Sequence, residues 1–274
     1  MACDNTGDLR GQAVAGSHYG GPDQRSSRPA RARRLRPRRP GPKPPPGCQP
    51  LPHGAGGLLY LRQNLSQALL AELFGCSRPT VSRLITRLTP VITTVLTPNA
   101  ERAADRDLRS TVRVDGFVAP TGDRRKDTYT SGMYSGKRHR CGFNIQVVGS
   151  IHGRLVLTGA PQPGAMHDAK AWRQSGLAAI FKGRLHADGG PGGFADTAYT
   201  GTGLCVPVRR QKGQTLTESA RDYNRAIASR RASVERVIAH LRNWRLLATG
   251  YRGLLDKFPP FLDAVTKLEI YRTS

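Results

Sequence analysis

Three carboxylates in this chain stand where they could bind a divalent cation together. Asp115 lies in the apolar run TVRVDGF, Asp196 follows an apolar Phe-Ala step, and Glu235 lies in a basic helical stretch. The chain holds 19 acidic residues against 43 lysines and arginines, so acids at the ends of predicted elements are informative. Mg²⁺ and Mn²⁺ prefer oxygen ligands, and Mg²⁺ usually combines a few carboxylates with water and substrate phosphate. The three acids therefore suggest a site for a hard cation.

Bringing these acids together would require a positive partner. Two carboxylates about 4 Å apart repel each other by roughly 4 kcal/mol at an effective dielectric near 20. A fold that gathers three of them therefore implies a bound cation. Two such ions can activate the attacking oxygen and stabilise the leaving oxygen in phosphodiester cleavage. Metal-dependent cutting of a nucleic acid is the chemistry that we expect.

Each acid also has an ordinary structural explanation. Asp115 or Asp196, each predicted at a strand end, can cap a turn or a helix. Glu235 can pair with Arg231 one helical turn earlier, which contributes only about 0.3–0.5 kcal/mol at an exposed site. Two further aspartates compete for a place in the site. Asp168 is the first alternative ligand, although we expect it to cap a helix beginning at Ala169, and Asp188 in HADGGPGG is a weaker competitor.

The charge balance points to a polyanionic partner. The formal net charge is +24, and nucleic acid is the commonest partner of so basic a surface. A protein that is merely basic, of the ribosomal type, is the alternative. We expect residues 1–55 to form a disordered arm. Its segment from Arg25 to Lys43 holds nine basic residues, no acidic residue and many prolines. A second basic segment is expected to contact phosphates, with a solvated loop as the alternative: Lys137, Arg138, His139 and Arg140.

Cysteine usage and hydropathy bear on the compartment. The five cysteines are scattered and form no CxxC pair, which argues against a disulfide framework and for a reducing environment. No apolar run approaches the roughly 18 residues of a membrane span, and the start of the chain lacks the apolar core of a signal peptide. We therefore expect a cytoplasmic, nucleoid-associated protein with no membrane partner.

Residues 58–92 have the pattern of two short helices joined by a tight turn. Ser66 can cap the first helix, Gly75 can end it, and Ser77 can cap the second. This pattern predicts a helix-turn-helix, although a plain helical hairpin has the same apolar spacing. The apolar stripes are Leu69, Leu70, Leu73 and Phe74, then Val81, Leu84, Ile85 and Leu88. The hydroxyl and guanidinium groups expected to reach DNA from the second helix are Arg78, Thr80, Ser82, Arg83 and Arg87.

From Thr111 the apolar period changes to that of strands. The run FNIQVV places Phe143, Ile145 and Val147 on one face, and a turn over residues 150–153 leads into a hairpin. HDAKAWRQSG predicts a short helix, FADTAY a strand end, and residues 218–247 one long basic helix. The order of these elements predicts a mixed α/β layer fold.

Several blocks of the chain, taken in order, resemble a known family. They are LSQALLAELFGCSRPTVSRLI, VDGF, YSGKRHRCGFNIQVV, PGAMHDAKAW, ADTAYTGTG and TLTESARDYNRAIASRRASVERVIAHLRNWRLLATGYRG. Residues from about 56 to 255 are similar to bacterial insertion-sequence transposases of the DDE superfamily, in the group related to the PIF/Harbinger elements. A single block is a weak signal, whereas six in the right order are a strong one.

The resemblance implies an RNase H-like catalytic domain, a mixed sheet with flanking helices, over residues 108–255. A helix-turn-helix over residues 56–95 would precede it, and a helical tail over residues 256–274 would follow. By this resemblance the catalytic, metal-binding residues are Asp115, Asp196 and Glu235, holding Mg²⁺ or Mn²⁺, while His167 and Asp168 match a supporting His-Asp pair. Such an enzyme binds terminal inverted repeats, cuts there and joins the ends to target DNA, at least as a dimer.

Three features depart from the family pattern. Phe117 stands where relatives usually have threonine, the segment before Asp196 is rich in glycine and is a poor strand, and the arm replaces a helical region. These departures keep an alternative open, an inactive transposase-derived protein that binds DNA. A general nuclease without end specificity is a further alternative.

Overall fold

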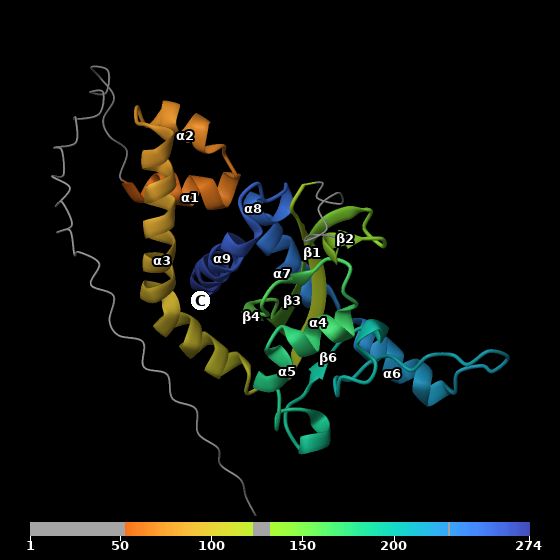
Figure 1. The fold of residues 1–274 in the computed structure, drawn as a ribbon. Coiled ribbons are helices and arrows are strands. Elements are labelled where there is room, and N and C mark those ends of the chain that lie inside the picture. Colours follow the sequence, from red (N-terminus) through yellow and green to blue (C-terminus); the bar gives the residue numbers. More distant parts are fainter. Residues whose placement is uncertain (1–52, 123–131, 230) are drawn as a thin grey trace, which may run out of the picture. The chain divides into compact units, whose positions relative to one another are not determined.

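The computed structural model describes residues 53–122, 132–229 and 231–274 (Figure 1). Most of the predicted arm, residues 1–52, lies outside this part of the chain. Residues 53–55 belong to the first helix, so the predicted end of the arm is three residues too late. The first turn of this helix, HGAGG, is rich in glycine, which has a low helix propensity, so the sequence does not predict a helix there. Among the described residues, no helix is both long enough and apolar enough to cross a bilayer.

The predicted helix-turn-helix is confirmed. The Ser66 hydroxyl accepts a hydrogen bond from the Leu69 N–H at 3.1 Å and so caps the first helix of the pair. Gly75 turns the chain with a φ of 57°, a conformation that glycine adopts cheaply. Ser77 then precedes the second helix. The helices of this region are α1 (His53–Gln63), α2 (Gln67–Leu73) and α3 (Arg78–Asp107).

The apolar stripe of α2 is only partly as predicted. Leu70 is fully buried, whereas Leu69 and Leu73 are 41% and 51% exposed. The short helix α2 contacts α1 and α3 along one narrow side only, so Leu69 and Leu73 on its other sides remain exposed. A Cβ built on Gly57 would lie 2.2 Å from Leu88 Cδ2, so glycine permits the close approach of α1 to α3.

The helix α3 is longer than the sequence predicts. It continues beyond residue 95 to Asp107, with Pro90 and Pro98 inside it. Figure 1 shows that its C-terminal part changes direction, as expected where proline removes a backbone donor and crowds the preceding turn. Packing against α9 (Phe258–Thr273) supports this length. The predicted C-terminal tail is therefore part of the core, with Phe258 and Val265 fully buried.

A mixed sheet forms the centre of the second half of the chain. Strand β1 pairs antiparallel with β3 and parallel with β6, in the order β2-β3-β1-β6, and β4 and β5 also pair with β3. The predicted hairpin is present, with the Gly153 N–H bonded to the Ser150 carbonyl at 3.0 Å. The strands are β1 (Val112–Pro120), β2 (Tyr134–Ser135), β3 (Arg140–Ser150), β4 (Leu155–Thr158), β5 (Gln162–Pro163) and β6 (Gly193–Phe194).

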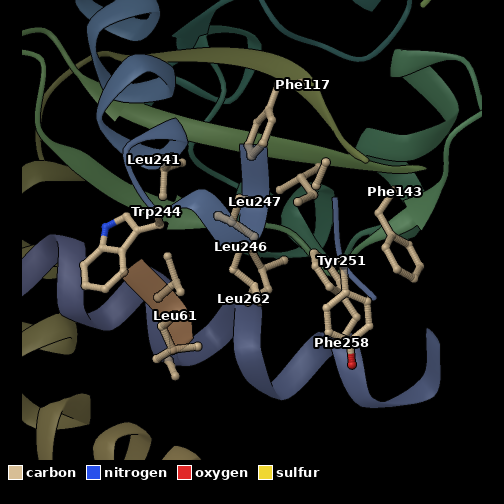
Figure 2. Close-up of a cluster of buried hydrophobic side chains, with 14 of the residues drawn as sticks. Leu61, Phe117, Phe143, Leu241, Trp244, Leu246, Leu247, Tyr251, Phe258 and Leu262 are labelled. Atoms are coloured by element: carbon tan, nitrogen blue, oxygen red, sulfur yellow. The ribbon is translucent and has the colours of Figure 1, made fainter. Parts of the chain in front are cut away.

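Helices cover both faces of this sheet, which confirms a mixed α/β layer fold. Ile145 and Val147 pack in a cluster with residues of α7, α8 and α9. Figure 2 shows this cluster, with Leu241 of α7, Leu246 of α8 and Leu262 of α9. Val112 and Val148 face a second cluster, built with residues of α4 and α5. The helices not yet bounded are α4 (Asp168–Gln174), α5 (Leu177–Ile180), α6 (Glu218–Ser229), α7 (Arg231–Arg242) and α8 (Arg245–Ala248).

Two predicted boundaries in this half are wrong. The predicted long basic helix over residues 218–247 covers α6 and α7, on either side of residue 230, which lies outside the described residues, but it ends at Arg242 because a turn separates α7 from α8. Asp115 does not end its strand, because β1 runs on to Pro120 in register with β3. The glycine after Asp115 suggested a stop, but the pairing continues through it.

Candidate active site

The pairing of β1 with β6 brings Asp115 and Asp196 to the same level of the sheet. The two strands run parallel, with Val112 opposite Gly193 and Arg113 opposite Phe194. Each aspartate lies two residues beyond the second of these pairs. Since side chains alternate between faces along a strand, each aspartate shares its face with the residue two before it. The Arg113 guanidinium carbon lies 5.2 Å from the centre of the Phe194 ring, consistent with a shared face.

Both aspartates are half-buried and make local hydrogen bonds. Asp115 Oδ1 accepts from the Gly116 N–H at 2.7 Å. Asp196 Oδ1 accepts from the Ala198 N–H at 2.8 Å and caps the short helix η3 (Thr197–Tyr199). The capping role considered for Asp196 is therefore present. It occupies one carboxylate oxygen and fixes the direction of the side chain, which is compatible with a ligand role.

Glu235 lies on α7, the helix that packs on β1 and β3. Its side chain is exposed. Arg242 lies seven residues later and hence on nearly the same side of the helix, with its guanidinium carbon 5.9 Å from the ring centre of Phe117 on β1. Glu235 follows the buried Val234 and thus lies at the exposed flank of α7, beside the face that packs on the sheet. Among the described residues, however, no three His, Cys, Asp or Glu side chains are grouped closely enough to hold a metal ion.

Asp168 has a different role from the one predicted. His167, not Asp168, is the N-cap of α4, with its Nδ1 atom accepting from the Ala169 N–H at 3.3 Å. The helix begins one residue earlier than expected, which places Asp168 in its first turn. There Asp168 Oδ1 accepts from Asn144 Nδ2 at 2.9 Å and from Gln146 Nε2 at 3.4 Å. A first-turn carboxylate also complements the positive end of a helix.

A buried phenol completes a polar network that the sequence did not reveal. The Tyr199 hydroxyl donates to Gln146 Oε1 at 2.5 Å, and Gln146 Nε2 donates to Asn144 Oδ1 at 2.8 Å. Burial, and then the negative charges of Asp168, Asp115 and Asp196, raise the pKa of Tyr199 well above its ordinary value of 10.0. The negative charges of the three aspartates therefore act on one phenol, although their carboxylates form no close group of three among the described residues. The two amide residues alternating with apolar residues in FNIQVV were the only sequence signal of this network.

Glycine at position 116 is required by the close packing of this network. A Cβ there would lie 2.8 Å from Gln146 Nε2 and 3.0 Å from Asp168 Oδ1. Any larger residue would displace one of these groups, which are held by hydrogen bonds in a buried setting. The glycine in VDGF thus serves the approach of the Asp168 carboxylate to β1.

The predicted DNA contacts in α3 are accessible. Arg78, Thr80, Arg83 and Arg87 are exposed, and Ser82 is half-buried. Thr80 Oγ1 accepts from Arg83 Nη2 at 3.3 Å, so these two side chains lie together on the outer face of the helix. Lys137 and His139 are exposed in the segment between β2 and β3. Asp188, the weaker competitor, accepts from the Gly183 N–H at 3.2 Å within an exposed turn and has a structural role there.

Comparisons with known proteins agree with this organisation. A family model described as DDE superfamily endonuclease matches residues 114–268, and one described as the helix-turn-helix of DDE superfamily endonuclease matches residues 57–98. A transposase assigned to insertion sequence element IS112 of Streptomyces albus G is 37% identical over 191 residues, covering 69% of this chain and 67% of that protein. No solved structure matches. The chain belongs to the DDE superfamily of endonucleases and is a bacterial insertion-sequence transposase with a helix-turn-helix region.

Proposed function

We propose that this transposase binds the terminal inverted repeats of a mobile DNA element through α2 and α3. It then cuts the DNA and joins the ends to a target in a reaction that depends on Mg²⁺ or Mn²⁺. Asp115, Asp196 and Glu235 are the proposed catalytic residues. The observation that carries this proposal is the parallel register of β1 with β6, because Asp115 and Asp196 each follow the last aligned pair by two residues. The helix α7, which packs on β1, supplies the glutamate.

The donor set of this region fits a hard divalent ion. Asp115 offers carboxylate oxygens from β1, Asp196 offers them from the N-cap of η3 just after β6, and Glu235 lies on α7, which packs on β1. In the described part of the chain, Asp168 and Asp196 have amide rather than cationic partners. A bound ion would supply stabilisation of developing negative charge on the phosphate oxygens and on the attacking hydroxyl. The protein's own contribution is to hold the carboxylates by backbone hydrogen bonds and to present the DNA strand to them.

Asp168 remains the alternative third acid. Its charge acts on Tyr199 together with those of Asp115 and Asp196, whereas that of Glu235 is not among the causes of the raised pKa. Replacing Glu235 and Asp168 singly by Gln and Asn separates the two assignments. The proposal expects Glu235→Gln to abolish cleavage and Asp168→Asn to reduce it by about 10- to 100-fold, the usual cost of losing a residue that orients a ligand. The reverse order would assign the third acid to Asp168.

The test of the proposed function is DNA cleavage. The full chain is incubated with a duplex carrying the element's terminal inverted repeat, with Mg²⁺, with Mn²⁺ or with chelator. We expect strand cuts at the repeat end in the presence of either metal and none in chelator. Asp196→Asn, which keeps a capping side chain, should bind the repeat as the wild type does and cut nothing. Cutting that survives this substitution would refute the assignment.

The exposed position of Glu235 favours one alternative, an inactive transposase-derived protein that only binds DNA. It predicts that repeat binding persists in chelator and weakens steeply with salt, with no strand cut under any metal condition. Detection of joined target products would eliminate it. Cutting of DNA that lacks the repeat, at the same rate, would instead indicate a general nuclease. The proposal also includes a relationship to the PIF/Harbinger group, which the order of the sequence blocks motivates. It includes assembly as at least a dimer, because the reaction joins two DNA ends.

A further inference from the structure

Three adjoining hollows lie along the C-terminal half of β1, from Gly116 to Pro120. The largest, about 980 Å³, is lined by Asn64 after α1 and by Arg252, Pro120 and Arg140. The next, about 310 Å³, shares Pro120 and Arg140 with the first and extends to Val118. Because neighbouring hollows share lining residues, they form one continuous depression that starts beside the helix-turn-helix region.

A third hollow extends this depression to the aspartate network. It measures about 270 Å³ and shares Val118 and Arg138 with the second hollow. Its other end is lined by Gly116, Asn144 and Asp168. The depression therefore runs from Asn64, in the connection between α1 and α2, to the strand that carries Asp115. We call it the basic groove, after six of the basic residues that line it, which together with His167 make up the full set: Lys137, Arg138, His139, Arg140, Arg242 and Arg252.

The charge of the basic groove is one-sided. All six basic residues are exposed and accessible to a polyanion. Among the described residues that line the three hollows, Asp168 at the far end is the only acid. These basic residues come from three separate segments of the chain, so the fold, rather than a single basic run, creates the groove. Clefts lined by one sign of charge concentrate oppositely charged ligands.

Several of these cations are held in place by the protein. Arg252 Nη2 donates to the Asn64 carbonyl at 2.5 Å, and Asn64 Nδ2 in turn donates to the Gly250 carbonyl at 3.0 Å. Arg242 lies over the ring of Phe117. His139 occupies the left-handed region with a φ of 50° and so orients the turn that precedes β3. Cations positioned in this way lose less side-chain entropy on binding a ligand.

We propose that the basic groove binds the sugar-phosphate backbone of one DNA strand, running from the repeat held by α3 to the aspartates. This inference rests on the proposed function, because it names the path of that enzyme's DNA substrate. The two narrow hollows have the size of sites that take drug-sized ligands, which suits a nucleotide unit rather than a double helix. The groove thus couples repeat recognition to the position of the cut.

The first test measures binding of two DNAs, the repeat alone and the repeat with its flanking segment. The groove variant carries Arg140→Ala, Arg242→Ala and Arg252→Ala; the matched control removes the same charge at exposed residues outside the groove, with Arg109→Ala, Lys182→Ala and Arg184→Ala. Three lost phosphate contacts reduce the slope of log K against log salt by about 2–3, or affinity by roughly 100-fold near 0.15 M salt. This loss is expected for the groove variant on the flanked DNA only. Equal losses for both variants, or no loss for the groove variant, would overturn the proposal.

The second test locates the strand. His139→Cys is incubated with DNA bearing a thiol-tethered nucleotide at successive flank positions on either strand, with Lys182→Cys as the control. Disulfide cross-links should form with one strand, between repeat and cut site, and only for the groove cysteine; equal yields on both strands would overturn the proposal. If His139→Cys cross-links as expected but the wild type never cuts, the proposed function fails and the groove stands. If the wild type cuts and the groove variant binds and cuts equally well, the groove fails and the function stands.

Discussion

Two groups of acidic residues differ in the partners that the fold gives to their carboxylates. Glu269 and Asp107 are buried and have cationic partners: Glu269 Oε1 lies 2.6 Å from Arg272 Nη2, and Asp107 Oδ1 lies 2.7 Å from Arg154 Nη2. Burial raises the pKa of Asp107, but hydrogen bonds and charges from Arg154 and Arg106 outweigh it and lower the pKa overall. In the part of the chain that the structure describes, Asp168 instead has amide partners.

This difference separates acids that stabilise the fold from acids that are available to a ligand. A buried carboxylate with its own arginine has its charge compensated within the protein. The aspartates around Tyr199 add like charges in one region, and their effect on the phenol shows that these charges act together. Within the described residues, Asp168 and Asp196 have amide partners, which leaves their charge available to an external cation.

Removing a structural acid should have the largest effect on stability. Glu269→Ala leaves Arg272 and the Trp244 indole N–H, 2.9 Å from Glu269 Oε2, without their acceptor. We expect a loss of about 3–5 kcal/mol in the free energy of unfolding, measured by urea titration. Asp196→Asn, as the comparison variant, should change stability by less than about 1 kcal/mol because asparagine also caps a helix. Similar losses for both variants would remove the distinction between the two groups.

A smaller effect is expected where the aspartate network meets β1. In Gly116→Ala the added Cβ overlaps Gln146 Nε2 and Asp168 Oδ1, and we expect a loss of about 1–3 kcal/mol in thermal or urea unfolding. The control is Gly136→Ala, since a Cβ at this exposed position meets nothing within 4 Å and surface substitutions usually stay within about 0.5 kcal/mol. An unchanged stability for Gly116→Ala would show that the network tolerates displacement.

The smallest effect concerns alkaline pH. Because the raised pKa of Tyr199 favours the neutral phenol in the folded state, this stabilisation is complete below the ordinary value of 10.0. It is lost as the pH rises through the folded-state pKa. Stability of the wild type, followed by circular dichroism, should therefore fall more steeply above pH 10 than that of Tyr199→Phe. Parallel curves for the two proteins would contradict the electrostatic link between the phenol and the aspartates.

The local features of the fold were predictable, and the long-range ones were not. Ser66 and Gly75 mark the ends of α2 through backbone chemistry that acts within a few residues. The length of α3 was missed because Pro90 and Pro98 suggest a stop, while packing against α9 keeps the helix intact. That packing depends on residues more than 150 positions away in the sequence.

The candidate site also has features that the sequence could predict and features that depend on long-range packing. The prediction of Asp115, Asp196 and Glu235 came from residue types and from the family resemblance, and it stays a prediction; the register of β1 with β6 is compatible with it for the two aspartates. The network of Tyr199, Gln146 and Asp168 was missed because its members become neighbours only when helices cover both faces of the sheet. The basic groove was missed beyond its first segment for the same reason, since Arg242 and Arg252 join it through the fold.

The central claim is that Asp115 and Asp196 bind a divalent metal ion together, and metal-directed cleavage of the protein tests it most directly. Fe²⁺ is added in place of Mg²⁺, with ascorbate and peroxide, and the cut positions in the chain are read by mass spectrometry. We predict cuts in β1 near residue 115 and after β6 near residue 196, suppressed by excess Mg²⁺ and lost in Asp196→Asn. Cuts elsewhere, or cuts that persist in this variant, would contradict the account.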